Sequence, residues 1–233
     1  MPNMNERKSP GTRSFPFAFW GRYRFGLLFG SLLLTIGGTA ILADFGLAGA
    51  LNVLILLDLL VLLTVVPGRW ALRAGLALLA TALVSWVLSV LSGAATFLAA
   101  GQISAVILFI LGTLGCFQAA FSPGPVDRER LAAALGFYLL LGLIFALIFS
   151  VIAELRPGSF HFAAPRPVEF PARPLTDMVY FSFVTLATLG YGDIVPLGSS
   201  VKGLAILEAI IGQMYLVVVV ARLVSLYGQA EEK

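Results

Sequence analysis

Long apolar runs alternate with short polar breaks along most of this chain of 233 residues. A helix needs about 20 apolar residues to cross a bilayer, because the hydrocarbon core is about 30 Å thick and each residue rises about 1.5 Å. The runs of about this length cover residues 25–43, 47–66, 74–92, 99–121, 131–153 and 201–227. All 12 prolines lie outside these runs, as expected of continuous helices. The pattern predicts an all-α membrane protein with six transmembrane helices.

The composition supports this interpretation and excludes several classes of protein. Hydrophobic residues make up 59% of the chain and charged residues 12%, whereas soluble domains have about 45–50% and about 25%. The single cysteine, Cys116, excludes an intrachain disulfide and a cysteine-rich metal site. The net charge of +3 comes from scattered basic residues that form no stripe, so we expect membrane lipids as partners and no nucleic acid.

The basic residues of the short loops predict the orientation in the membrane. Arg69 and Arg73 follow the second run, residues 122–130 after the fourth run carry Arg128 and Arg130, and the other two short loops carry no Lys or Arg. Because Lys and Arg favour the cytoplasmic side, both termini are expected there, in the plasma (cell inner) membrane. This predicts a cytoplasmic segment over 1–24, a cytoplasmic linker over 122–130 and a short cytoplasmic tail over 228–233.

The segment between the last two runs is too long and too patterned for a simple loop. Residues 156–174 contain five prolines and are expected to form an extended surface loop, within a turret over 154–176. Thr176 is a predicted N-cap for a short helix over 177–187. A helix of this length cannot cross a bilayer, so the segment is predicted to be re-entrant. Such backbone is tolerated at membrane depth where it lines water or is buried in protein.

A five-residue motif follows this short helix. Residues 188–192 read Thr-Leu-Gly-Tyr-Gly, which resembles the Thr-Val-Gly-Tyr-Gly selectivity filter of the potassium channel superfamily. The resemblance covers about 131–227 and implies potassium ions held by the backbone carbonyls of Thr188, Leu189, Gly190 and Tyr191 and by the Thr188 hydroxyl. It implies no other cofactor. Because Leu189 would use its backbone oxygen alone, we expect selectivity to be retained and filter stability to change.

The residues around the motif are expected to support it. Thr185 precedes the motif and Asp193 follows it, as in the family. In some relatives a glutamate stands at the position of Val184 and contacts the aspartate after the filter, so Asp193 is expected to find other partners here. The resemblance also implies that the side chain of Tyr191 points outward against an aromatic collar, for which the candidates are Tyr180, Phe181 and Phe183.

One chain supplies one filter strand, and one strand cannot surround an ion. The resemblance therefore implies a homotetramer, with the last run as the inner helix. Gly212 in that helix lies where the family often has a hinge glycine, and both a gating hinge and close helix packing stay open for it. The pore domain is predicted over 131–227, with outer helix 131–153, pore helix 177–187, filter 188–192 and inner helix 201–227.

The first four runs, 25–121, resemble a voltage-sensor domain that lacks gating charges. Residues 99–113 contain no charged side chain, which excludes a conventional voltage sensor. No catalytic arrangement is present in the sequence, so we do not expect an enzyme. The sequence predicts a potassium-selective channel that conducts passively. A weakly selective or ligand-gated cation channel stays open as an alternative, as does a transporter in which Gly-Tyr-Gly is coincidental.

Two acidic residues lie inside predicted spans, where a carboxylate is costly. Asp58 has three interpretations: a proton- or ion-sensitive switch, a polar contact with another helix through Ser85 or Thr81, and a relic of the acidic site of a voltage sensor. Glu208 lies one turn before Gly212, and its side chain is expected to face either the pore or the short helix near Thr185.

Overall fold

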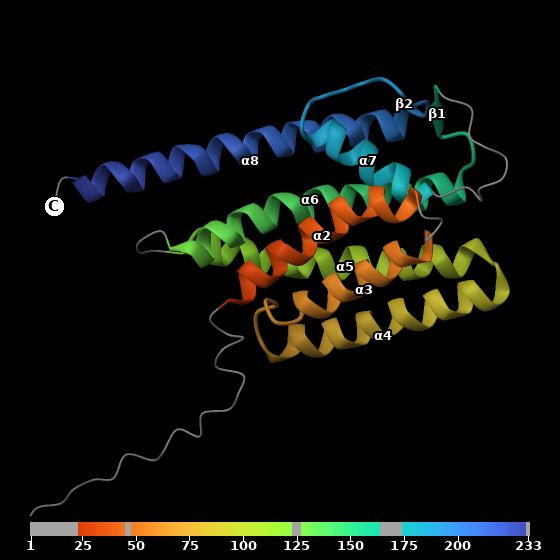
Figure 1. Ribbon diagram of the computed structural model, residues 1–233, viewed down its shortest axis with the longest axis horizontal. Helices are drawn as coiled ribbons and strands as arrows, with labels where there is room; N and C mark the ends of the chain where they lie inside the picture. Colours follow the sequence, from red (N-terminus) through yellow and green to blue (C-terminus); the bar gives the residue numbers. More distant parts are fainter. Residues whose placement is uncertain (1–22, 45–47, 123–126, 164–173, 232–233) are drawn as a thin grey trace, which may run out of the picture.

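The computed structural model describes residues 23–44, 48–122, 127–163 and 174–231, which form helices and one small sheet (Figure 1). Its helices are α2 (Arg24–Asp44), α3 (Ala48–Leu62), α4 (Arg69–Ser92), α5 (Ala95–Ala120), α6 (Arg128–Leu155), α7 (Pro174–Leu186) and α8 (Ser199–Glu231). Its strands are β1 (Phe160–Phe162) and β2 (Ile194–Pro196). We call α2 to α5 the four-helix half, and α6 to α8 with the strands and residues 187–193 the pore half.

Each predicted apolar run coincides with a helix, but not every helix is long enough to be counted as a span. In the described residues, four segments are long and apolar enough to cross a membrane, namely Arg69–Ser92, Thr96–Ala120, Arg128–Leu155 and Ser199–Arg222. The described apolar parts of α2 and α3 are shorter. The chain is therefore a helical membrane protein, and the count of six spans stays a prediction.

The second run was predicted to be helical to residue 66, and this boundary is wrong. Helix α3 ends at Leu62, and two amides shortly after it donate to carbonyls three residues back, Thr64 to Val61 and Val65 to Leu62. Such a tight turn closes the helix before Pro67, which biases the residue preceding it toward an extended backbone.

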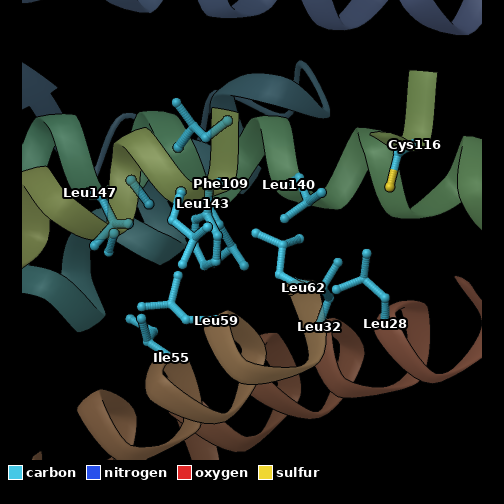
Figure 2. Packing of buried hydrophobic residues seen from close by; sticks show 14 of the residues in the cluster. Leu28, Leu32, Ile55, Leu59, Leu62, Phe109, Cys116, Leu140, Leu143 and Leu147 are labelled. Carbon is cyan, nitrogen blue, oxygen red and sulfur yellow. The ribbon is translucent and has the colours of Figure 1, made fainter. Parts of the chain in front are cut away.

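The four-helix half packs against the outer helix α6 of its own chain. Figure 2 shows Leu32 of α2, Leu59 of α3 and Phe109 of α5 meeting Leu140 and Leu143 of α6, and all five side chains are at most 1% exposed. This shared apolar core places α6 between the four-helix half and the other helices of the pore half (Figure 1).

Two polar contacts join the halves near opposite ends of α6. Near its start, Glu129 Oε2 accepts a hydrogen bond from the amide of Phe25 at 3.0 Å, which satisfies a free amide in the first turn of α2. Toward its other end, Ser150 accepts from Gln102 Nε2 of α5 at 3.0 Å. The four-helix half is thus fixed to the pore half along the whole length of α6.

The segment between α6 and α8 differs from its sequence-based prediction in two ways. Helix α7 begins at Pro174, so Thr176 lies inside the helix and is not its N-cap. Proline suits the first turn of a helix because the amide that it lacks would have no partner there. Residues 160–162 form a strand, paired antiparallel with β2, and not part of a structureless loop. None of these three residues is proline, and Pro196 of β2 stands at the end of the pairing, opposite Phe160.

The predicted outer and inner helices are also extended by the structure. Helix α6 starts at Arg128, where Asp127 caps it by accepting from the Arg130 amide at 2.9 Å. Helix α8 begins at Ser199 and ends at Glu231, past the predicted limits of 201 and 227.

Candidate selectivity filter and its support

The backbone of the filter motif has an unusual alternation of φ angles. Thr188, Gly190 and Gly192 have positive φ, at 58°, 55° and 78°, while Leu189 and Tyr191 between them do not. In a regular strand, successive carbonyls point to opposite sides. Alternation between left-handed and right-handed φ lets successive carbonyls face one side, which is what a row of ion-coordinating oxygens requires. Among described non-glycine residues, Thr188 is the one with positive φ.

The inner end of the motif is hydrogen-bonded to the last turn of α7. The amide of Thr188 donates to the carbonyl of Thr185, and the amide of Leu189 donates to that of Val184, both at 2.9 Å. Thr185 therefore contacts the filter through its backbone, and the Val184 side chain is buried. The position of α7 fixes where the filter begins.

The outer end of the motif is held at Asp193. Its side chain accepts from the Ile194 amide at 3.1 Å, and its carbonyl accepts from the Ala163 amide at 2.8 Å, next to β1. The hydrogen bond that the Tyr180 hydroxyl donates to the Asp193 carboxylate raises the pKa of Tyr180 above its usual value. Sequence reasoning expected a substitute partner for Asp193 and did not identify Tyr180. The available signal was its spacing, one helical turn before Val184.

Helix α7 is held from behind by residues of α6 and α8. The carbonyl of Leu186, in its last turn, accepts from the Tyr138 hydroxyl at 3.3 Å and from Gln213 Nε2 at 3.4 Å. These two donors satisfy a carbonyl that has no partner within the helix. Ser182 contacts both neighbouring helices, through the carbonyl of Gly142 at 2.7 Å and through the carboxyl group of Glu208.

Two glycines allow the neighbouring helices to approach α7 closely. A Cβ at Gly142 of α6 would overlap the ring of Phe183, and a Cβ at Gly212 of α8 would overlap the side chain of Leu186. Close packing is therefore a property of Gly212 in this structure, and the hinge stays a prediction. The side chain of Glu208 is fully buried and contacts Ser182 of α7. Ser182 lies three residues before Thr185 in the same helix.

The aromatic residues of α7 do not form the expected collar within one chain. Phe181 makes edge contacts with Phe149 and Phe160, with ring centroids 5.1 Å and 5.4 Å away, and is buried. Phe183 packs against Gly142. Tyr180 is the member of the proposed collar that lies near Tyr191. The aromatic cluster instead joins α6, β1 and α7 behind the filter.

Asp58 lies far from this site, in the four-helix half. Its Oδ2 accepts a hydrogen bond from the Thr35 hydroxyl of α2 at 2.6 Å, and both residues are at most 1% exposed. It contacts another helix, but neither Ser85 nor Thr81, the partners named from the sequence. Thr81 instead donates to Ser104 at 3.2 Å.

At the opposite end of the pore half from the filter, α8 contacts the end of α5. Arg222 donates to the carbonyl of Ser122 at 2.9 Å and lies over the ring of Phe121, 4.7 Å from its centroid. The Arg130 guanidinium donates to the same carbonyl at 3.3 Å. This contact joins the inner helix to the segment that leads from the four-helix half into α6.

Comparisons with known proteins find a family model that matches the pore half and two curated relatives of the chain. The family model described as "Ion channel" matches residues 133–229. The inward rectifier potassium channel Kirbac3.1 of Paramagnetospirillum magnetotacticum is 37% identical over 87 residues, which cover 36% of this chain and 24% of that protein. Protein LctB of Geobacillus stearothermophilus is 35% identical over 89 residues, 37% of this chain and 62% of LctB. No solved structure matches the chain significantly.

These matches confirm the resemblance to the potassium channel superfamily. They point to an ion channel and away from an enzyme. The chain spans 24% and 62% of the lengths of the two curated relatives, so the activity of those whole proteins is not transferred with the match.

Proposed function

We propose that the protein is a potassium-selective channel that conducts K⁺ passively, with residues 188–192 as its selectivity filter. The observation that carries the proposal is the alternating φ of these residues at the end of a short helix held by α6 and α8. The carbonyls of such a backbone replace the hydration water of a dehydrated cation. Helix α7 also points its C-terminal, partly negative end toward the motif, which favours a cation there. The match to a potassium channel supports K⁺ as the ion.

Flux of K⁺ from liposomes that contain the purified protein tests the proposal. Gly190→Ala is expected to abolish flux, because a Cβ at a φ of 55° costs about 1–2 kcal/mol in each filter strand. Gly30→Ala is the matched control, since this helical glycine has ordinary φ and nothing within 4 Å of an added Cβ. Flux that Gly190→Ala leaves intact would refute the proposal. Equal flux of Na⁺ and K⁺ would favour the weakly selective alternative.

We further propose a homotetramer, because a ring of four filter strands is needed to enclose an ion. In the single chain, Tyr191 is 65% exposed and Leu189 55% exposed, next to the motif's own glycines. Many apolar side chains of α8 are also exposed, including Ile206, Leu207, Ile210, Met214 and Val217. Light scattering of the detergent-solubilised protein should give the mass of four chains, and a stable dimer would contradict this assembly.

The proposed orientation places both termini in the cytoplasm of a plasma (cell inner) membrane. Contacts between Phe25 and Glu129 and between Arg222 and Ser122 bring the start of α2 and the end of α8 to the same end of the molecule. Figure 1 shows the starts of α2, α4 and α6, which carry Arg24, Arg69 and Arg128, at this same end. Labelling of a cysteine introduced at Arg69 with a membrane-impermeant reagent should succeed from the cytoplasmic side alone.

Opening of the pore is proposed not to depend on a conventional voltage sensor. Helix α5 carries no charged residue, so a membrane potential can do no work on it. Flux in liposomes should therefore follow the K⁺ driving force alone when the voltage is stepped. A steep change of open probability with voltage would contradict this proposal.

A further inference from the structure

A carboxyl group is buried where the three helices of the pore half meet. Glu208 of α8 has no exposed surface, and its Oε1 contacts the hydroxyl of Ser182 in α7, which is equally buried. The same hydroxyl lies 2.7 Å from the carbonyl oxygen of Gly142 in α6. A single oxygen atom, Ser182 Oγ, therefore joins α6, α7 and α8.

The protons available at this contact can be counted. The Ser182 hydroxyl has one proton, and the carbonyl of Gly142 can only accept. When Ser182 donates to Gly142, no proton remains between Ser182 Oγ and an ionised Glu208, and the two oxygens repel each other. A protonated Glu208 resolves the conflict, since its own hydroxyl donates to Ser182 Oγ.

We propose that Glu208 is held in its neutral, protonated form, and that the relay from Glu208 through Ser182 to Gly142 positions the pore helix for conduction. Glu208 is thus a positioning residue, which acts on the filter through α7. The proposal deepens the assignment of the pore half as a potassium channel and rests on it.

The surroundings of Glu208 supply no charge that would favour a carboxylate. In the described residues, Glu208 has no salt bridge and its second oxygen, Oε2, has no hydrogen-bond partner. A buried carboxylate without a cation or a full set of donors is costly. Neutral Glu208 leaves an unpaired carbonyl oxygen at that position, which costs much less.

The other titratable groups of the three helices do not neutralise Glu208. From α6, the phenol of Tyr138 faces it closely enough to interact electrostatically, but its hydroxyl donates to Leu186. From α7, Tyr180 donates to Asp193. Asp177 lies in the first turn of α7, five residues before Ser182, and is itself acidic.

On α8, the remaining titratable groups are also committed elsewhere or lie at the helix ends. Tyr215 donates to the carbonyl of Ala134 at 2.6 Å, and Arg222 donates to Ser122. Lys202, six residues before Glu208, is exposed near the start of the helix. Among the described side chains of the three helices, no cation therefore lies beside Glu208 to take the place of its proton.

Loss of that proton has a defined structural consequence. The one proton left on Ser182 can serve either Gly142 or Glu208, so α7 loses its buried contact with α6 or with α8. The remaining side-chain hydrogen bonds to the end of α7 are long, at 3.3 Å and 3.4 Å, and both go to Leu186. Because the filter begins directly after α7, we expect conduction to fall as the pH rises through the titration of Glu208.

The variant Glu208→Gln removes the titratable proton of residue 208 and keeps the packing of its side chain. The glutamine amide fills the same volume and can donate to Ser182 Oγ, but it does not titrate. Infrared spectra of wild type should contain a carbonyl-stretch band of a protonated carboxyl group that Glu208→Gln lacks. Asp58→Asn, a change at the buried acid of the four-helix half, should leave this Glu208 band in place.

Flux in liposomes then tests the positioning role. Wild-type K⁺ flux should decrease with rising pH, while Glu208→Gln should conduct like wild type at neutral pH and keep its flux up to a pH of about 10, the ordinary value for tyrosine. Ser182→Ala breaks the relay at all pH values and is expected to lower flux roughly tenfold. The same pH dependence in wild type and Glu208→Gln would overturn the positioning role.

The infrared and flux measurements also distinguish this proposal from the proposed function. Absence of the band from the wild-type minus Glu208→Gln difference would overturn the protonation of Glu208, whether or not the protein conducts. Absence of K⁺ flux from wild type would refute the channel assignment and the role of Glu208 in conduction, while an intact band would still support its protonation.

Discussion

The four-helix half and the pore half each bury one carboxyl group against a hydroxyl group, but the two contacts join different numbers of helices. Asp58 of α3 pairs with Thr35 of α2. Glu208 of α8 meets Ser182 of α7, whose hydroxyl also contacts Gly142 of α6. The first contact joins two helices that follow each other in the chain, while the second joins three helices around the element that carries the filter.

This difference indicates that a buried contact between a carboxyl group and a hydroxyl group has a different role in each half. In the pore half, the polar contacts converge on α7, since Leu186 also receives donors from Tyr138 and Gln213. In the four-helix half, they hold neighbouring helices in pairs. A disrupted contact in the pore half should therefore change the flux of the folded protein, whereas an equal disruption in the four-helix half should change stability alone.

Gly142→Ala is expected to have the largest effect. Its added methyl group overlaps the ring of Phe183, and overpacking of this kind costs about 1–3 kcal/mol. Because Phe183 belongs to α7, the pore helix must shift, and K⁺ flux per folded protein should fall by roughly tenfold or more. Thermal unfolding and liposome flux measure the two effects separately.

Gly115→Ala is the matched change in the four-helix half, where the methyl group would overlap the backbone carbonyl of Val65. It should lower the unfolding temperature to a similar extent and leave flux per folded protein unchanged. Equal loss of flux in both variants would break the distinction between the halves.

The sequence predicts the helices and the filter motif because both signals are local. Apolar runs and the five residues 188–192 can be read without knowing which elements meet. The partners of buried polar groups could not be predicted in this way. Asp58 meets Thr35, and neither Thr81 nor Ser85, because α2 packs beside α3 on the face that Asp58 occupies. The partner of Asp58 depends on how the helices pack, and the sequence of a single apolar run does not determine this packing.

The segment between α6 and α8 could not be predicted fully from local sequence either. Proline density favoured a loop throughout 156–174, yet residues 160–162 pair with β2 once α7 and the filter bring the two segments together. The start of α7 at Pro174 was missed for a different reason, because Thr176 offered a good capping side chain two residues later. The backbone needs no such cap when proline lies in the first turn.

Thr35→Val tests the four-helix half through its buried acid. The substitution keeps the volume and removes the hydroxyl that donates to Asp58 at 2.6 Å, so a buried acceptor loses its donor at a cost of about 1–3 kcal/mol. A lower unfolding temperature with unchanged flux per folded protein is expected. A loss of flux as large as that of Ser182→Ala would show that Asp58 acts on the pore.

Tyr180→Phe tests the outer end of the filter with a smaller expected effect. It removes the phenol hydroxyl that interacts with Asp193, at a partly exposed position, and leaves the other contacts of Asp193 in place. Steady K⁺ flux should decrease by less than about tenfold. Tyr23→Phe, at the far end of the molecule, serves as the control and should conduct like wild type.

The pH dependence of this contact has a definite sign. The pKa of Tyr180 is raised because its hydroxyl donates to Asp193, so folding favours the protonated phenol. The contact is fully present below the ordinary tyrosine value of about 10 and is lost as the pH rises through the higher folded value. In the Glu208→Gln background, where residue 208 does not titrate, flux should show this loss above a pH of about 10, and adding Tyr180→Phe should remove it. An identical alkaline profile would contradict the role of Tyr180.

The smallest effect is expected at the hydrogen bond between the halves, from Gln102 to Ser150. Gln102→Leu removes this bond and also a buried oxygen, Oε1, that has no partner in the described residues, so part of the loss is offset. A double-mutant cycle with Ser150→Ala should give a coupling energy of about 0.5–1.5 kcal/mol. Flux should be unchanged, since Ser150 lies on α6 away from α7's polar contacts. Altered flux in Gln102→Leu alone would mean that the four-helix half controls the pore through α6, and the two halves would then differ in location but not in function.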